Sequence, residues 1–186
     1  MKLLPSLILL SLSAQALASP YINHYTTKDQ RDLSTYKSVI QNILTTVVKF
    51  GQDIVLNTSH LNNDFDNIID AIAQGTKTLE PEAPLNYFQA GVLLIPIIPV
   101  NKAIHMALQS LINRRDILVA AGLKSILIQD LQKVKDVVVP FSKILLKKVP
   151  NLYINRYTQS YTEIIDDITE AINVYSKVVG ATSHNT

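Results

Sequence analysis

Histidines are the first side chains to test for chemistry, because imidazole is the commonest metal ligand in proteins. The sequence has four of them, His24, His60, His105 and His184, and none lies within one helical turn of another. A zinc site needs clustered imidazole, thiolate or carboxylate ligands, and the chain contains no cysteine. We therefore expect no metal site, and the lack of thiols also excludes cysteine-based catalysis.

Three aspartates, Asp64, Asp66 and Asp70, form the densest acidic group and raise the question of a calcium site. A calcium-binding loop requires oxygen ligands at alternate positions and a glycine at its sharp turn. Ile68 and Ile69 stand where a ligand and that glycine would be needed. We expect the three carboxylates to be acids near a helix start, on a solvated face.

A second acidic group, Asp166, Asp167 and Glu170, raises the question of paired carboxylates for acid and base catalysis. These residues fall on the polar side of the last amphipathic segment, where nothing would raise a carboxyl pKa. The sequence also lacks a Gly-x-Ser-x-Gly elbow, a phosphate-binding loop and a dinucleotide-binding motif. We expect a protein without catalytic residues or cofactor.

Lysines make one side of the segment before Pro150 basic: Lys133, Lys135, Lys143, Lys147 and Lys148. They could attract an anionic head group or an acidic glycan, although lysines near a helix C-terminus are more often solvated and complement the helix dipole. The whole chain carries 17 basic and 15 acidic side chains. This balance supplies no basic surface for nucleic acid, so we expect no nucleic-acid partner.

The elements that carry these side chains follow from the spacing of the apolar residues. Steps of three and four predict a first helix from Lys28 to Leu56. A second helix carries the apolar residues between Leu61 and Ile72 on one face, and Gly75 is expected to end it. A last helix carries a stripe from Tyr157 to Tyr175.

The segment from Tyr87 to Val100 is apolar on every face and contains Pro96 and Pro99. Proline inside a helix removes a hydrogen bond and clashes with the preceding turn. We expect a short helix, then a buried bent connection, then a helix from Val100 to Ala121 that Gly122 stops.

A further helix is expected between Leu123 and Pro150, with a kink at Pro140. Long amphipathic segments joined by short turns predict an all-α protein, a four- or five-helix bundle with a central apolar groove or cavity. Several tyrosines fall in the apolar stripes: Tyr36, Tyr157, Tyr161 and Tyr175. A buried tyrosine hydroxyl needs a partner, which is a ligand's polar group in a binding cavity and a carbonyl or water in a plain core.

Composition leaves two interpretations of this core open. Hydrophobic residues make up 47% of the chain and charged residues 17%, against about 25% charged in an average soluble domain. Either the protein has a large ordinary core, or its interior or surface takes up apolar material.

The first 18 residues are expected to be a cleaved secretory signal, because Lys2 precedes the apolar run from Leu7 to Leu12 and small residues precede Ser19. Residues 19–186 then form a single helical domain that is secreted, with no transmembrane segment in the mature chain. Asn57-Thr58-Ser59 is an acceptor sequence for N-glycosylation in a predicted turn.

Five features in a characteristic order carry a family resemblance: Asp32-Leu33 in the opening helix, the linker from Leu79 to Ala90, Gly122-Leu123 between helices, Lys147-Lys148-Val149-Pro150 at a helix end, and the closing Ala171-Ile172-x-x-Tyr175. In these features the chain resembles the fungal family of hydrophobic-surface-binding protein A and the cell-wall galactomannoproteins. The resemblance covers nearly all of the expected mature chain.

The resemblance implies a secreted or wall-associated helical bundle that binds apolar surfaces or encloses a fatty acid or other lipid between its helices. It implies an acyl chain along the bundle axis, in contact with Phe65, Ile69, Leu108, Leu111, Leu127, Leu131, Ile168 and Ile172. Tyr161, or Ser142 beside the stripe, is the head-group anchor that we expect. Unlike wall-anchored members, this sequence has no Ser/Thr-rich stalk and no apolar C-terminal tail, which favours free secretion or loose wall association.

Three alternatives to a lipid carrier remain. The protein could adsorb to hydrophobic surfaces through an exposed wedge at Val92 to Val100 and recruit a secreted hydrolase. It could be a structural cell-wall mannoprotein with a filled core. An enzyme would need a site whose residues have no recognisable spacing.

Overall fold

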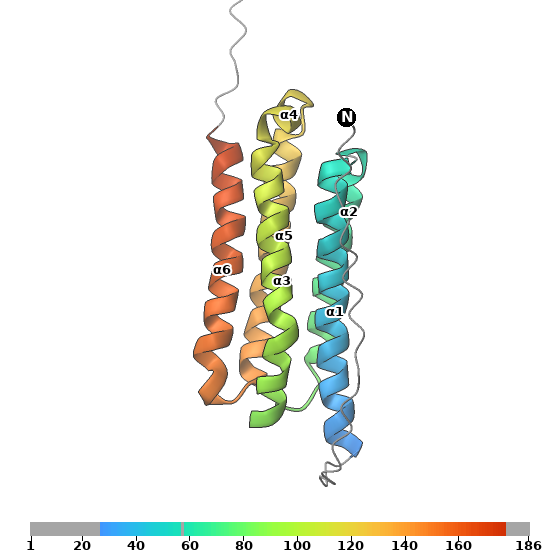
Figure 1. Ribbon diagram of the computed structural model, residues 1–186, viewed down its shortest axis with the longest axis vertical. Coiled ribbons are helices and arrows are strands. Elements are labelled where there is room, and N and C mark those ends of the chain that lie inside the picture. The colour runs from blue at the N-terminus through green and yellow to red at the C-terminus, as the bar shows by residue number, and fades with distance from the viewer. Residues whose placement is uncertain (1–26, 57, 178–186) are drawn as a thin grey trace, which may run out of the picture.

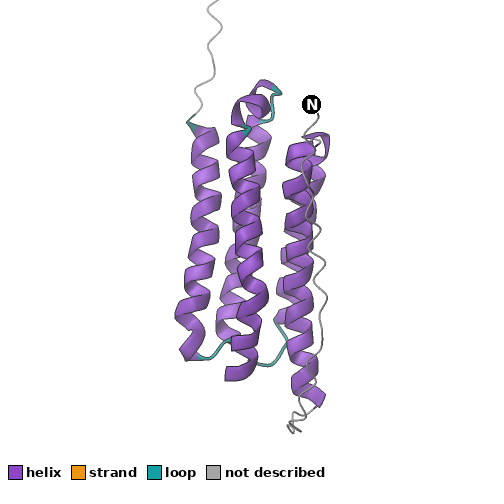
Figure 2. Ribbon diagram, in the orientation of Figure 1, coloured by secondary structure: helices purple, strands orange, loops and turns teal. Residues whose placement is uncertain are grey.

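The computed structural model describes residues 27–56 and 58–177, and these residues are almost entirely helical (Figures 1 and 2). Its helices are α1 (Thr27–Leu56), α2 (Leu61–Leu79), α3 (Tyr87–Asn113), the short α4 (Arg115–Ala120), α5 (Lys124–Lys148) and α6 (Asn151–Ser176), with a 3₁₀ turn at Thr58–His60. No strand occurs within these ranges. The expected all-α bundle is confirmed, with five long helices.

The five long helices form a closed ring, because α1 packs against α2 and α3, α2 against α5, α5 against α6, and α6 against α3. With neighbouring axes about 9 Å apart, five helices in a ring lie about 8 Å from the common centre, against about 6 Å for four helices. Side chains must therefore reach further to fill the axis of this bundle. Small internal spaces along the axis are the consequence.

The first and last long helices match their sequence expectations. The first was expected from Lys28 to Leu56 and begins one residue earlier, at Thr27. The last contains the whole predicted stripe, with Tyr157 and Tyr175 buried. Simple amphipathic periodicity was sufficient for both.

The expectation that Gly75 ends the second helix is wrong, because α2 continues through it to Leu79. Gly75 is buried, and a Cβ atom at this position would lie 2.7 Å from Val39 Cγ1 and 3.3 Å from Phe141 Cε2. This glycine permits close approach of α1 and α5 to α2. Its role lies in packing between helices.

The expected buried bent connection before Val100 is also wrong, since α3 is one helix that includes Pro96 and Pro99. Pro99 removes the hydrogen bond to the carbonyl of Ile95, and both residues are exposed, so water can solvate that carbonyl. The exposed face carries Ile95 and Ile98, each 69% exposed, while Leu93 on the other face is fully buried.

The helix expected to continue to Ala121 is interrupted at Arg114, before the predicted stop at Gly122. The Arg114 guanidinium donates hydrogen bonds to the carbonyls of Ile54 and Val55, at the C-terminal end of α1. A cation there complements the helix dipole. Gly122 then has φ +77° and ends α4, with Leu123 N donating to Leu118 O at 3.0 Å, as expected for a left-handed helix stop.

The linker between α2 and α3 is tied to the end of α5. Leu85 N donates to Lys148 O at 2.7 Å, and the Lys148 ammonium donates to the carbonyls of Glu80, at 2.8 Å, and Glu82. The Tyr36 hydroxyl donates to Ala83 O at 2.9 Å. This end of the ring is therefore closed by hydrogen bonds that join three helices.

By length and composition alone, α3 is apolar enough to cross a membrane. In the bundle it packs between α1 and α6, and 28% of its apolar window is buried. The predicted signal at residues 1–18, the sequon residue Asn57, and the histidines His24 and His184 lie outside the described residues.

Candidate ligand cavity

Two cavities lie between the five long helices of the ring. The larger, which we call the Asn101 cavity, has a volume of about 80 Å³. It is lined by Ile40, Ile43, Ile72, Ile97, Val100, Asn101, Ile104, Val138, Phe141, Ser142, Leu145, Leu146, Tyr157, Ser160, Tyr161 and Ile164. All five long helices contribute to its wall.

The smaller cavity, which we call the Phe50 cavity, has a volume of about 40 Å³ and lies further along the axis. It is lined by Ile43, Val47, Phe50, Phe65, Ile68, Ile72, Ile104, Ala107, Leu108, Leu131, Val134, Val138, Ile164 and Ile168. Every one of these side chains is apolar. The rings of Phe50 and Phe65 pack with their centroids 4.7 Å apart.

Five aliphatic side chains, one from each long helix, line both cavities: Ile43, Ile72, Ile104, Val138 and Ile164. They form a layer across the ring that separates the two spaces. Such side chains can change rotamer within a core. The two cavities together thus define one apolar path along the bundle axis.

Polar groups in the wall are confined to the Asn101 cavity. Ser142 Oγ donates to Val138 O at 2.8 Å, and the Tyr157 hydroxyl donates to Ala90 O at 2.9 Å. Asn101 Nδ2 donates to Ser160 O at 3.3 Å, whereas Asn101 Oδ1 is buried without a hydrogen-bond partner. A buried acceptor left unpaired costs about 1–3 kcal/mol, so Asn101 is the least satisfied group in this wall.

The sequence left open whether the buried tyrosine hydroxyls bind a ligand or a carbonyl or water of a packed core. Tyr36, Tyr157 and Tyr175 all donate to main-chain carbonyls, the last to Leu111 O at 2.7 Å. These are the partners expected in a packed core. Burial raises the pKa of Tyr157 and raises the pKa of Tyr175 to about 12.

Six of the ten predicted ligand-binding residues line a cavity. Phe65, Leu108, Leu131 and Ile168 line the Phe50 cavity, and Ser142 and Tyr161 line the Asn101 cavity. The other four line neither cavity: Leu111 and Leu127 are buried, and Ile69 and Ile172 are partly buried against the core.

Sequence reasoning placed Leu108 of α3 in the site but missed the other cavity residues of this helix, above all Asn101. The segment was expected to bend before Val100, which obscured the face formed by Ile97, Asn101, Ile104 and Leu108. These positions follow one another at steps of four, three and four, the spacing of one helix face. A lone amide within an apolar helix face was the available signal.

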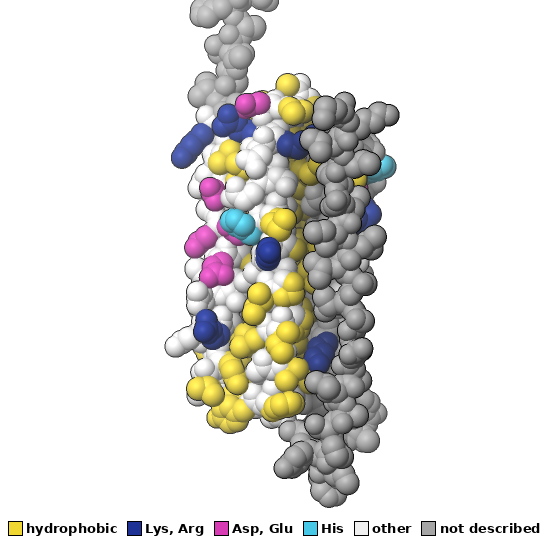
Figure 3. All heavy atoms as spheres, in the orientation of Figure 1, with side chains coloured by type: hydrophobic (Ala, Val, Ile, Leu, Met, Phe, Trp, Pro, Cys, Tyr) yellow, Lys and Arg dark blue, Asp and Glu magenta, His cyan; other side chains and the backbone are white. Residues whose placement is uncertain are grey.

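The seam between α3 and α6 has an acidic outer side, next to the Asn101 cavity. A surface depression there is lined by Asn101, Lys102, His105, Glu163, Ile164, Asp166 and Asp167. Its wall shares Asn101 and Ile164 with the Asn101 cavity. Figure 3 shows acidic side chains gathered beside a histidine over α6, and His105 Nδ1 lies 3.1 Å from both carboxylate oxygens of Asp167.

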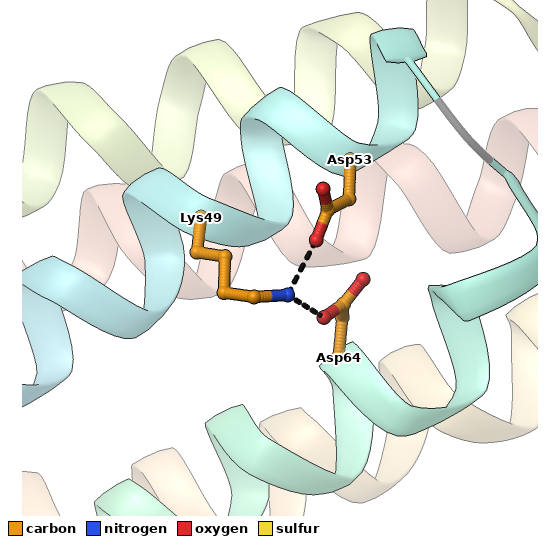
Figure 4. Close-up of polar contacts among 3 residues, drawn as sticks. All are labelled: Lys49, Asp53 and Asp64. Carbon is orange, nitrogen blue, oxygen red and sulfur yellow. Dashed lines mark hydrogen bonds and ion pairs between the residues drawn. The ribbon is translucent and has the colours of Figure 1, made fainter.

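A separate polar cluster joins α1 to α2, where Lys49 contacts both Asp53 and Asp64 (Figure 4). Asp64 is 3% exposed, so the expectation that it lies on a solvated face is wrong, whereas Asp66 and Asp70 are exposed. Hydrogen bonds to Asp53 and Asp64 raise the pKa of Lys49, and that from Lys49 lowers the pKa of Asp53. No group of three or more metal-ligating side chains occurs in the described part of the chain.

Comparison with known proteins gives a family match and a similar fungal protein. The family model for hydrophobic surface binding protein A matches residues 30–147. The chain is 39% identical over 155 residues to cell wall mannoprotein 1 of Talaromyces marneffei, a match that covers 81% of this chain and 34% of that protein. This chain therefore spans about a third of that relative's length.

Solved structures similar to this one include two ligand-binding domains of the Penicillium marneffei MP1 protein. Domain 1, complexed with arachidonic acids, has a TM-score of 0.76 and 30% identity, covering 78% of this chain and 99% of that one. Domain 2, complexed with multiple arachidonic acids, has a TM-score of 0.75 and 28% identity, covering 77% and 96%.

Proposed function

This chain belongs to the hydrophobic surface binding protein A family, and from that premise we propose that it takes up a fatty acid or similar lipid between its helices. The ligand lies along the path formed by the Asn101 and Phe50 cavities. The observation that carries this proposal is the closed ring of five helices, whose axis is apolar and incompletely filled. The similar MP1 domains complexed with arachidonic acids support the ligand class.

The proposed acyl chain contacts the apolar wall of the Phe50 cavity, including Phe65, Leu108, Leu131 and Ile168. The head group lies in the Asn101 cavity, where Ser142 and Tyr161 are. Apolar contact along the path supplies most of the affinity, since burial of a methylene group stabilises by about 0.8 kcal/mol.

Lipid uptake requires the ring to widen. Cavities that hold drug-sized ligands measure about 300–1,000 Å³, whereas the two cavities here measure about 80 and 40 Å³. The shared layer of Ile and Val side chains is where the path is closed. An acyl chain would displace these side chains and part neighbouring helices, replacing contacts within the protein by contacts with the ligand.

We further propose that the protein is a non-catalytic binding protein that acts outside the cell or at the cell wall. The similarity to a cell wall mannoprotein supports this location. No described cluster joins a nucleophile to a base, and the conspicuous ion pairs, Lys49–Asp64 and Lys133–Asp130, lie outside the cavity wall.

A second candidate function is adsorption to apolar surfaces, with recruitment of a secreted hydrolase. The exposed isoleucines of α3, Ile95 and Ile98, favour it, and Figure 3 shows apolar side chains gathered over this helix. A groove between α1 and α3 adds Val55, Leu56 and Met106, which are 54%, 80% and 58% exposed.

Native mass spectrometry of the secreted protein, followed by solvent extraction of whatever it carries, tests the two functions. A stoichiometric lipid, or a mass shift on addition of palmitic or arachidonic acid, supports uptake. A protein that carries no lipid and does not shift with either acid contradicts uptake and leaves surface adsorption as the better explanation.

A further inference from the structure

We propose that the Asn101 cavity selects lipids whose head group carries an O–H donor and no charge, through a hydrogen bond to Asn101 Oδ1. Protonated carboxylic acids and primary alcohols share this chemistry. The inference rests on the proposed lipid uptake and names the head group that the site accepts.

The orientation of the Asn101 amide follows from its neighbour. Ser160 O lies 3.3 Å from Asn101 Nδ2, and a carbonyl oxygen can only accept a hydrogen bond. The amide nitrogen must therefore face Ser160, which leaves Asn101 Oδ1 buried without a partner; among the described residues it shares that state with Asp64 Oδ2, which lies outside the cavity wall. This oxygen requires a donor, and neither a carboxylate nor a methyl ester has one.

Two further wall residues, Ser142 and Tyr157, have hydroxyls whose protons are already used within the protein. Ser142 Oγ uses its proton on Val138 O, and the Tyr157 hydroxyl uses its proton on Ala90 O. Their lone pairs are what remains for a ligand. Ser160 and Tyr161 also line this cavity, and their hydroxyls can donate or accept, so Asn101 Oδ1 is the group that separates an O–H head group from an anion.

Electrostatics around the cavity also disfavour an anion. No charged side chain is among the described residues that line it, so a carboxylate there would lose its hydration without gaining a cation. On the adjacent seam, α3 contributes Lys102 and His105, whereas α6 contributes Glu163, Asp166 and Asp167. Three carboxylates face one ammonium group, and His105 is paired with Asp167.

Competition binding to delipidated protein tests this selection with three probes of equal chain length: palmitic acid, 1-hexadecanol and methyl palmitate. We expect hexadecanol to bind about tenfold more tightly than methyl palmitate, independently of pH. Palmitic acid should match hexadecanol at about pH 4 and bind at least about tenfold more weakly at about pH 8, because carboxylic acids in water ionise near pH 4.

The variant Asn101→Leu should lose about tenfold in hexadecanol affinity and keep its affinity for methyl palmitate. Asn155→Leu, which changes an exposed asparagine of α6, is the matched control and should bind all three probes as before. Asn101→Ser guards against a folding defect in the leucine variant, since its hydroxyl adds no buried charge, can still accept a hydrogen bond from hexadecanol and should keep part of the preference over methyl palmitate.

Two results would overturn the selection: palmitate binding that is tighter at about pH 8 than at about pH 4, or equal losses for all three probes in Asn101→Leu. Binding of none of the probes by the unmodified protein would instead refute lipid uptake. A preference for hexadecanol that disappears in Asn101→Leu supports the proposal.

Discussion

The two cavities share five wall residues and the same five helices, yet they differ in chemistry. The Phe50 cavity is lined only by apolar side chains, and the Phe50 and Phe65 rings pack together in its wall. The Asn101 cavity is about twice as large, at about 80 against 40 Å³, and contains an amide and hydroxyl groups. On the proposed function, the Phe50 end of the path holds the acyl chain and the Asn101 end holds the head group.

This difference shows how one bundle can divide two tasks between its ends. Tight apolar packing in the Phe50 wall stabilises the fold, and the less satisfied Asn101 wall retains polar groups at a cost in stability. Substitutions in the Phe50 wall should therefore change stability most. Those in the Asn101 wall should change ligand preference most.

The largest expected effect is a difference in stability between alanine substitutions at two leucines of α5, one in the wall of each cavity. Leu131→Ala, in the Phe50 wall and 1% exposed, should lower the free energy of unfolding by about 2–5 kcal/mol. Leu145→Ala, 8% exposed, should cost less, because Leu145 borders a cavity about twice as large as the one beside Leu131 and has fewer packing contacts to lose. Urea unfolding measures both.

Leu152→Ala is the control for this pair, because Leu152 is 72% exposed and its truncation should change the free energy of unfolding by less than about 0.5 kcal/mol. If Leu145→Ala cost more than Leu131→Ala, the proposed division between a stabilising wall and a ligand-selecting wall would be wrong.

The next effect, on ligand affinity, is expected at the layer of aliphatic side chains between the two cavities. Ile104→Trp should block the path, so palmitic acid should bind about tenfold more weakly, while octanoic acid, whose shorter chain does not have to cross the layer, should lose less affinity. Overpacking should cost about 1–3 kcal/mol of stability, so binding is compared at a temperature where the variant is folded. Ile98→Trp, at an exposed position of α3, should leave both affinities unchanged.

An alkaline effect concerns the buried tyrosines of α6. The pKa of Tyr175 is raised from 10.0 to about 12, so its contribution is fully present below pH 10 and is lost as pH rises through about 12. Unfolding free energies measured across this range should fall with pH. In Tyr175→Phe the unfolding free energy should depend less on pH in this range. Below pH 10 the variant should be less stable by about 1 kcal/mol, because the hydrogen bond to Leu111 O is lost. An unchanged pH profile in this variant would contradict the assignment.

The smallest expected effect is at Tyr161 in the Asn101 wall. Tyr161→Phe should weaken the binding of palmitic acid a few-fold, because one hydrogen bond to its head group is lost. The binding of methyl palmitate should weaken less, because the ester has no proton to donate to the Tyr161 hydroxyl. Isothermal titration calorimetry measures both ligands. Equal losses for acid and ester would remove Tyr161 from the head-group site.

Local sequence was sufficient for α1 and α6 and for the stop at Gly122, where periodicity or a left-handed glycine acts within a few residues. It was insufficient at Gly75 and at Pro96 and Pro99, because these residues are also typical of helix ends. Gly75 is accommodated by the neighbouring side chains of Val39 and Phe141. The prolines are accommodated by a helix that is packed on one side and open to water on the other.

The candidate site, too, could be predicted from local sequence only in part. Apolar stripes identified Phe65, Leu108, Leu131 and Ile168 as inward-facing, because helical spacing alone places side chains on one face. The stripes could not separate these residues from Leu111 and Leu127, which are equally buried and line no cavity. That distinction depends on where neighbouring helices leave space.

The sequence by itself determined an all-helical chain, its amphipathic faces and its resemblance to a lipid- and surface-binding family, because these depend on spacing along one segment. Only the tertiary structure decided that five helices close into a ring, that the axis stays partly unfilled, and that Asn101 meets Ser160 across the α3–α6 seam. The physical reason is that a cavity and an unpaired buried oxygen are properties of several helices packed together.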